Sequence, residues 1–265
     1  MMGLKIVVCA KQVPDTNEVK IDPVKNTLIR EGVPSILNND DANALEEALR
    51  IKDKYPDTHI TVISMGPLQA KDMLIECLAM GADEAILASD RALGGSDTWA
   101  TSNALAAVIN KLGHFDIIFA GRQAIDGDTA QVGPQIAEKL GIPQVTYVSE
   151  FELDGDTITV KRALEDGYER IKLKMPCMLT AIKELNKPRY MTIGGIYDAT
   201  KKEIPVWTAE DIGVDLNKVG LEASPTNVFR SFTPAPKGKG IMIEGDGEKE
   251  LARNLLINLK AKHVI

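Results

Sequence analysis

The 265-residue sequence lacks an excess of positive charge, a membrane-spanning apolar run and a secretion signal. Its formal net charge of −7 argues against general nucleic-acid binding, which depends on Lys and Arg to neutralise phosphates. No apolar run reaches the roughly 18 residues that a transmembrane helix needs, and the N-terminus lacks the charged and apolar regions of a signal peptide. These absences predict a soluble, cytoplasmic protein that binds neither nucleic acid nor membrane.

Cysteine, histidine and the common catalytic motifs are also scarce or missing. Cys9, Cys77 and Cys177 lie far apart in apolar segments, which predicts buried thiols rather than a disulfide or a metal site. Only three histidines occur, so a histidine general base is poorly supported. The GxGxxG, Walker A, HExxH, CxxC and GxSxG patterns are absent, which removes the commonest motif-based assignments.

Strand-like and helix-like segments alternate through residue 141. Continuous apolar runs rich in β-branched residues predict strands that are buried on both faces of a parallel sheet, at 4–10, 59–66, 84–89 and 116–121. Amphipathic patterns predict helices between and after them, at 40–55, 68–82, 98–112 and 129–140. The alternation predicts an α/β fold with a Rossmann-like, doubly wound parallel sheet.

The pattern changes after residue 141. Residues 144–183 form short alternating runs broken by Asp-Gly turns, which predicts an antiparallel extension of the sheet. Residues 184–247 are rich in Pro and Gly with one short helix start at 208–213, so this stretch is predicted to wrap another protein. An amphipathic helix follows at 248–265. We therefore predict a nucleotide-binding domain at 1–183 and a recognition loop with a C-terminal, partner-wrapping arm at 184–265.

The loop AGRQAIDGDTAQ, at 120–131, is the strongest candidate binding site. Together with residues 9–15 and 64–67 it follows a predicted parallel strand, at the sheet edge where open sheets bind ligands. Gly121 and Gly127 allow a close backbone approach or a positive φ, and the amides of residues 128–131 would point from a helix N-terminus toward an anion. The loop therefore predicts a phosphate site.

A plain strand-to-helix connection is the alternative, because Asp128 or Thr129 makes a good N-cap. Two details favour binding over this alternative. Pro134 is predicted to lie several positions inside the helix, where it would leave the Ala130 carbonyl without its usual partner. The loop is also unusually polar for a connection, since Arg122 accompanies two aspartates.

At this loop the sequence resembles the β subunit of electron transfer flavoproteins. The segments AKQVPD, NNDDANALEEALR, MGP, LAMGAD, GRQAIDGDTAQVGPQ and LNKPRYMT follow the order and spacing of that family over nearly the whole chain. The resemblance implies a fold similar to adenine nucleotide α-hydrolases, a larger α subunit that carries FAD, and an adenine nucleotide buried in this chain. The implied nucleotide contacts are Cys9, Ala10, Asn38, Asn39, Asp40, Asp41, Met65, Gly121, Arg122, Gln123, Ala124, Ile125, Asp126, Gly127, Asp128, Thr129, Ala130, Gln131 and Val132. Asp40 and Asp41 are equally suited to be simple N-caps.

The nature of the nucleotide separates two functions within the family. Ordinary members carry a structural AMP and serve acyl-CoA dehydrogenases. Electron-bifurcating members hold a second FAD that accepts a hydride from NADH and sends electrons to ferredoxin or flavodoxin and, through the α-subunit FAD, to a dehydrogenase. The small residues Gly127, Ala130 and Gly133, and the lack of an aromatic residue near Thr16, resemble the bifurcating branch. No catalytic side chain is expected, so NADH oxidation would belong to the heterodimer. A stand-alone nucleotide-binding hydrolase or sensor is the rival of another class.

The segment LNKPRYMTIGGIYDATKK resembles the recognition loop with which the family binds its partner dehydrogenase. The resemblance implies that Leu185 anchors the partner, with Pro188, Arg189 and Tyr190 beside it. Pro188 would rigidify the loop and so lower the ordering cost of docking. The alternative is that Leu185 is a core residue at the end of a strand.

Overall fold

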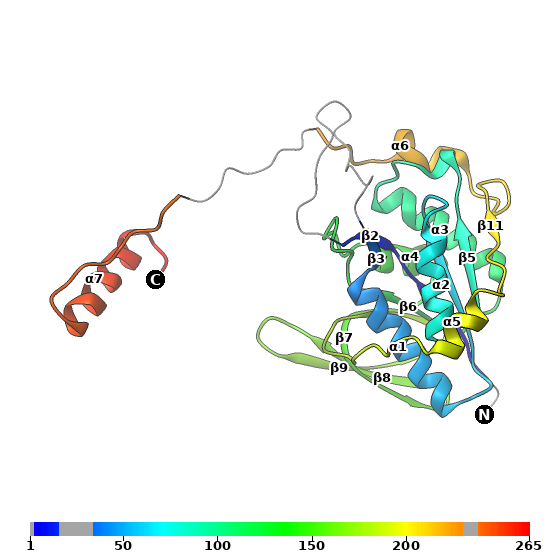
Figure 1. Cartoon of the computed structure of the whole chain (residues 1–265), viewed down its shortest axis with the longest axis horizontal. Coiled ribbons are helices and arrows are strands. Elements are labelled where there is room, and N and C mark those ends of the chain that lie inside the picture. Colours follow the sequence, from blue (N-terminus) through cyan, green and yellow to red (C-terminus); the bar gives the residue numbers. More distant parts are fainter. Residues whose placement is uncertain (1–2, 16–33, 230–237) are drawn as a thin grey trace. The chain divides into compact units, whose positions relative to one another are not determined.

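The computed structural model describes residues 3–15, 34–229 and 238–265 (Figure 1). The chain forms two compact units, Met1–Phe229 and Arg230–Ile265. Residues 184–229 therefore pack with the α/β unit, and the boundary predicted after residue 183 lies inside it. Within the described ranges, no helix is both long enough and apolar enough to cross a membrane.

A nine-stranded sheet organises the first unit, in the order β11-β5-β4-β1-β6-β10-β7-β8-β9. Four of its parallel strands correspond to the predicted ones and are β1 (Lys5–Cys9), β4 (His59–Met65), β5 (Glu84–Ala88) and β6 (Ile117–Gly121). The four predicted helices are present as α1 (Asn39–Lys54), α2 (Ala70–Met80), α3 (Thr98–Leu112) and α4 (Val132–Leu140). The predicted α/β, doubly wound fold is confirmed.

The helices cover both faces of the sheet because alternate strand residues face opposite sides. On one face, Leu45 of α1 and Leu74 of α2 are buried in the same core as Phe119 of β6. On the other face, Val108 of α3 and Ile136 of α4 share a second core with strand residues. Both faces of the central strands are therefore covered by apolar side chains, as expected for strands whose sequences are unbroken apolar runs.

The predicted antiparallel extension is correct for three strands and wrong for a fourth. Strands β7 (Gln144–Asp154), β8 (Thr157–Ala163) and β9 (Tyr168–Lys174) form an antiparallel meander. Strand β10 (Cys177–Ala181) instead lies between β6 and β7 and runs parallel to both. All five of its residues are buried, as expected of a central parallel strand rather than a half-exposed antiparallel one.

Residues 184–229 contain more regular structure than the sequence predicts. Helix α5 (Ile193–Ala199) packs against α2, and β11 (Val206–Trp207) adds a short parallel strand beside β5. The helix start predicted at 208–213 is a turn in the structure. Its ends are joined as in a capping box: the Thr208 amide donates to Asp211 Oδ2 at 2.8 Å, and the Asp211 amide donates to Thr208 Oγ1 at 3.2 Å. Short helical turns complete the segment at η2 (Leu216–Lys218) and α6 (Gly220–Ala223), next to η1 (Arg91–Leu93).

The second unit contains the predicted C-terminal helix, α7 (Glu248–Ala261). None of its residues is buried, and the apolar side chains of Leu251, Leu255 and Ile257 are exposed. Its burial on a partner subunit remains a prediction.

Candidate functional site

The sheet has a topological switch point between β1 and β6. The chain leaves β1 toward β4 on one side and later returns, through α3, to β6 on the other side. In open α/β sheets the crevice outside the carboxyl ends of such a strand pair is the preferred ligand site. Residues 9–11 at the end of β1 and residues 121–131 after β6 therefore meet at one edge, as the sequence predicts.

Asp41 ties these two strand ends to α1. Its carboxylate accepts hydrogen bonds from the Lys11 amide at 2.9 Å and from the Gly121 amide at 2.8 Å. The residue is 7% exposed, and burial raises the pKa of its carboxyl to about 7, although both amide bonds favour the ionised form. Asp41 lies in the first turn of α1 but does not cap it, so the N-cap alternative is wrong for this residue.

Asn38 fastens the loop after β6 to the same helix. Its side-chain amide donates to the Gln123 carbonyl at 2.9 Å, and its Oδ1 accepts from the Ile125 amide at 3.2 Å. Its own backbone amide donates to the Lys11 carbonyl at 3.0 Å. Asn38 is fully buried, so it orders the edge of the crevice instead of offering its side chain to a ligand.

Two ion pairs brace the loop. Lys11 Nζ lies 2.7 Å from Asp126, whose side chain is 5% exposed, so the pair links the end of β1 to the loop. Arg122 Nε lies 3.3 Å from Asp40 Oδ2, and its guanidinium also lies 5.7 Å from the ring centre of Tyr147. Burial raises the pKa of Asp40 despite the nearby arginine. Arg122 Nε and Asp40 Oδ2 are both buried and face each other as an ion pair, although not in hydrogen-bond geometry.

The loop leads into α4 through an unusual backbone. Asp128 and Ala130 have φ angles of 49° and 53°, a region that non-glycine residues seldom occupy and that is concentrated at functional sites. The predicted positive φ angle thus falls on these residues and not on Gly127. The Asp128 side chain accepts from Gln123 Nε2 at 2.8 Å.

Helix α4 begins at Val132, three residues later than predicted. Its N-cap residue is Gln131, whose side chain makes no capping bond, so the alternative that Asp128 or Thr129 caps the helix is wrong. Pro134 consequently lies in the first turn, where backbone amides have no intrahelical partner anyway. The predicted cost of this proline does not arise.

The remaining predicted contact residues differ in how exposed their side chains are. Cys9 and Ala10 are buried at the end of β1, and burial raises the pKa of the Cys9 thiol, which makes it an inert packing group. Met65, at the end of β4, is half-buried, whereas Asn39 and Thr129 are exposed. Thr16 lies outside the described residues.

Gly133 is small for a reason other than room for a ligand. A Cβ on Gly133 would lie 2.7 Å from Thr180 Cγ2 and 3.3 Å from Met178 Cε, so the glycine lets α4 pack closely on β10. Gly127 is open, because no atom lies within 4 Å of the place that a Cβ would occupy on this residue. The interpretation of Gly133 as space for a flavin is therefore replaced by helix–strand packing.

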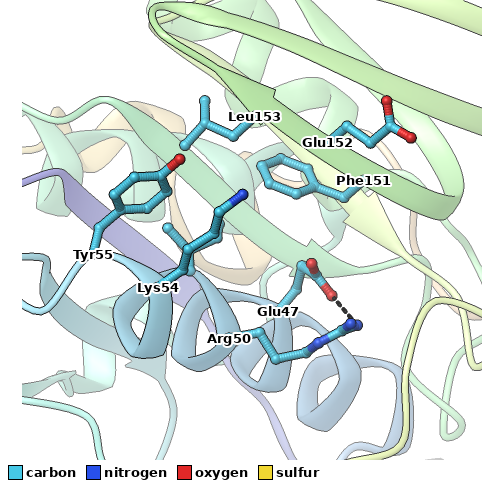
Figure 2. Close-up of a pocket in the computed structure, with 8 residues that line it drawn as sticks. Glu47, Arg50, Lys54, Tyr55, Phe151, Glu152 and Leu153 are labelled. Atoms are coloured by element: carbon cyan, nitrogen blue, oxygen red, sulfur yellow. Dashed lines mark hydrogen bonds and ion pairs between the residues drawn. The ribbon is translucent and has the colours of Figure 1, made fainter. Parts of the chain in front are cut away.

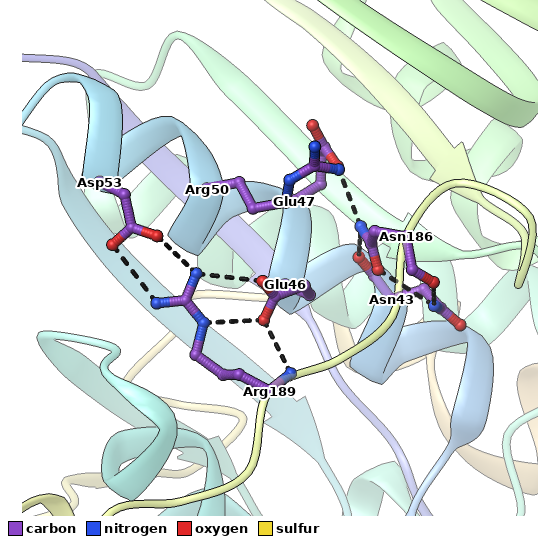
Figure 3. Close-up of polar contacts among 7 residues, drawn as sticks. All are labelled: Asn43, Glu46, Glu47, Arg50, Asp53, Asn186 and Arg189. Atoms are coloured by element: carbon purple, nitrogen blue, oxygen red, sulfur yellow. Dashed lines mark hydrogen bonds and ion pairs between the residues drawn. The ribbon is translucent and has the colours of Figure 1, made fainter.

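The predicted recognition loop offers a different apolar residue from the one expected. Leu185 is 8% exposed and belongs to the core, which is the alternative that the sequence left open. Ile193 and Tyr190 are 90% and 89% exposed. The guanidinium of Arg189 is occupied by Glu46 and Asp53 of α1 (Figure 3).

A pocket of about 250 Å³ lies between the C-terminal half of α1 and residues 151–153 of β7 (Figure 2). Phe151 and Leu153 of β7 line it with Tyr55, the residue that follows α1. Within it, Arg50 pairs with Glu47 at 3.2 Å, and the Lys54 ammonium lies 5.5 Å from the centre of the Tyr55 ring. This pocket is separate from the predicted contacts at the switch point.

Sequence reasoning missed two contributors to the crevice. Lys11 lies two residues after β1, within the predicted loop 9–15 but not among the predicted contacts, and its charge is opposite to that of Asp126. Tyr147 has φ of 58° within β7, and its amide donates to Thr180 Oγ1 at 3.2 Å. No local pattern marks this residue, because its position depends on the insertion of β10 beside β7.

The fold and the switch-point crevice define a doubly wound α/β protein. Residues 25–212 match the electron transfer flavoprotein domain, and the chain therefore belongs to the electron transfer flavoprotein family, as a β subunit. It is 62% identical to the electron transfer flavoprotein subunit beta of Clostridium acetobutylicum, over 99% of this chain and 100% of that protein. It is 61% identical to the caffeyl-CoA reductase-Etf complex subunit CarD of Acetobacterium woodii, with the same coverage. The acryloyl-CoA reductase electron transfer subunit gamma of Anaerotignum propionicum is 49% identical over 99% of this chain and 100% of that protein.

Proposed function

We propose that this β subunit binds FAD in the switch-point crevice and works with an α subunit as an electron-bifurcating flavoprotein. When bound, this flavin would accept a hydride from NADH. One electron would go to ferredoxin or flavodoxin, and the other would go through the α-subunit FAD to a dehydrogenase. The protein groups described here hold and orient the nucleotide and keep solvent out, and none acts as a covalent catalyst.

The open N-terminus of α4 is the observation that carries the proposal. Its first amides point out of the helix without a capping side chain from Gln131, and the helix dipole favours an anion at that end. The loop before it is braced by Asn38 and by the Lys11–Asp126 pair, so these donors are ordered in advance. Such a donor set suits the phosphates of an adenine nucleotide.

Arg122 and Asp40 form an ion pair at the same edge, with 3.3 Å between Nε and Oδ2, and burial raises the pKa of the Asp40 carboxyl. We keep both side chains among the proposed nucleotide contacts, as the family resemblance implies.

The names of the relatives suggest the partners of this chain. One relative belongs to a caffeyl-CoA reductase-Etf complex and another is an acryloyl-CoA reductase subunit, which supports a flavin-dependent acyl-CoA dehydrogenase or reductase as electron acceptor. We propose that the exposed apolar residues between Tyr190 and Tyr197, with Ile193 at their centre, dock this enzyme. Exposed aromatic and aliphatic clusters of this kind are typical of interaction sites.

An ordinary electron carrier with structural AMP is the second candidate, because the same amides suit either nucleotide. Purification of the heterodimer, release of its nucleotides by denaturation and their quantification distinguish the two. Two FAD per heterodimer is the expected result, and one FAD with one AMP would contradict bifurcation. A chain that purifies as a monomer and turns over ATP would instead support the stand-alone hydrolase.

A further inference from the structure

One arginine joins the exposed segment to α1 through a fork of hydrogen bonds. Arg189 Nε and Nη2 donate to the two carboxylate oxygens of Glu46 at 2.9 and 3.0 Å, and Nη2 also donates to Asp53 at 2.6 Å (Figure 3). The Arg189 backbone amide donates to the same Glu46 carboxylate at 3.0 Å. Glu46 is 5% exposed, and charge-assisted hydrogen bonds are stronger where water is excluded. The Asp53 side chain is 62% exposed, so its bond to Arg189 contributes less.

Asn186 makes a second attachment three residues earlier. Its side-chain amide donates to the Asn43 carbonyl at 3.0 Å and to Glu47 at 2.9 Å, while Asn43 Nδ2 donates back to the Asn186 carbonyl at 2.8 Å. Four residues on one side of α1 therefore hold the start of the segment (Figure 3). The guanidinium keeps the pKa of Asp53 below its usual value, which agrees with a formed ion pair.

The other end of the segment is attached to α2. Lys202 Nζ donates to the carbonyls of Ala82 and Asp83, both at 2.9 Å, just beyond the C-terminus of that helix. Gly195 lies so close to α2 that an added Cβ would collide with the Ala79 carbonyl. A lysine near a helix C-terminus is also favoured by the helix dipole.

The residues between the two attachments are strongly exposed although their backbone is held. The exposed large apolar side chains are Tyr190, Met191, Ile193, Ile196 and Tyr197. A pocket of about 360 Å³ opens beside them. It is lined by the end of α2 and the residues after it (78–83), by Tyr190, Thr192 and Gly195, and by the attachment residues Arg189 and Lys202. The chain thus presents apolar side chains and a hollow from a fixed backbone.

We propose that residues 186–202 are a docking platform ordered before binding, and that Arg189 is its positioning residue because it holds the platform on α1. This inference rests on the proposed docking function. A platform held in advance loses less conformational freedom when the partner binds, so affinity depends on the attachment as well as on the exposed side chains.

Arg189→Gln tests the attachment in the intact heterodimer. We expect faster amide hydrogen exchange across residues 187–199, and about tenfold weaker binding to the caffeyl-CoA reductase of Acetobacterium woodii, used as the probe. Arg189→Lys keeps the charge but not the fork, so it should resemble Arg189→Gln more than the wild type. Arg170→Gln is the matched control, because this exposed β9 arginine makes only a 3.7 Å surface pair with Glu150.

The hydrogen exchange and the binding measurements test the positioning role of Arg189 and the docking function separately. Unchanged exchange in Arg189→Gln would overturn the positioning role, and so would faster exchange with wild-type affinity for the reductase. A wild-type heterodimer that does not bind the reductase, or one in which Ile193→Ala leaves binding intact, would overturn the proposed docking function. Even then, amide hydrogen exchange would still test the role of Arg189, since that measurement is made without the reductase.

Discussion

The Asp41 carboxylate occupies the space beside Gly121 that a side chain on residue 121 would fill. The Gly121 amide donates to the Asp41 carboxylate at 2.8 Å, and a Cβ on Gly121 would overlap that carboxylate. The same Cβ would lie 2.7 Å from the Asp40 carbonyl carbon and the Asp41 nitrogen, which belong to the backbone of α1 and cannot rotate away. The first turn of α1 therefore reaches the end of β6 only because residue 121 is glycine.

Gly121→Ala is expected to destabilise the fold by about 1–3 kcal/mol, the usual cost of overpacking a core. Because α1 must move away from β6, nucleotide retention should fall as well. Gly127→Ala is the matched control for stability alone: no atom lies within 4 Å of its Cβ position, so its effect on the free energy of unfolding should stay within about 0.5 kcal/mol. Urea unfolding and the nucleotide content of the purified heterodimer measure both effects. Equal stability of the two variants would show that α1 tolerates the added methyl group.

Asp41 predicts a pH dependence of stability that its neutral variant lacks. Burial raises the pKa of its carboxyl from 3.8 to about 7, so between these pH values the unfolded state loses a proton that the folded state keeps. The free energy of unfolding of the wild type, relative to Asp41→Asn, should therefore fall as pH rises from about 4 to 7, by at most about 1.4 kcal/mol per pH unit. Above pH 7 the difference should level off. Denaturant titrations at several pH values measure it, and a difference that grows with pH would mean that the two amide bonds outweigh burial.

Lys11→Met removes the cation from a pair whose carboxylate is almost fully buried. We expect a loss of about 1–2 kcal/mol, below the roughly 3–5 kcal/mol of a wholly buried pair because the Lys11 side chain is 44% exposed. The loop before α4 should also exchange its amide hydrogens faster. Lys161→Met is the control, since its 2.7 Å pair is with Glu150, an exposed carboxylate of the meander, and the loss should be smaller than for Lys11→Met. Similar losses for the two variants would remove the structural role of Lys11.

The sequence predicts the parallel strands well because both of their faces are buried, which leaves continuous apolar runs that few other structures produce. It does not predict the place of β10. That strand follows the meander in the chain but pairs with β6 and β7, and such long-range pairing is not encoded in a local pattern. The expectation of an antiparallel strand came from its neighbours in sequence and was wrong for that reason.

The candidate site was predicted as a set of loops, but not as a network. Asp41 bonds residues that are 30 and 80 positions away, and nothing in the local sequence distinguishes that role from capping a helix. The late start of α4 was missed because Asp128 and Thr129 are good N-cap residues, whereas the positive φ of Ala130 follows from how the loop is braced. Tertiary contacts outweighed local preference in both cases.

Leu185 and Ile193 give the sharpest comparison between the sequence prediction and the structure. Leu185→Ala should lower stability by about 2–5 kcal/mol because its side chain is buried in the core. Ile193→Ala should change stability by less than about 0.5 kcal/mol, since the side chain is 90% exposed, yet weaken dehydrogenase docking by about tenfold or more. Thermal unfolding and binding of the reductase, measured on the same heterodimer preparations, separate the two effects. If Leu185→Ala kept full stability and lost docking while Ile193→Ala kept both, the anchor would be Leu185, and the platform would have to open to release it.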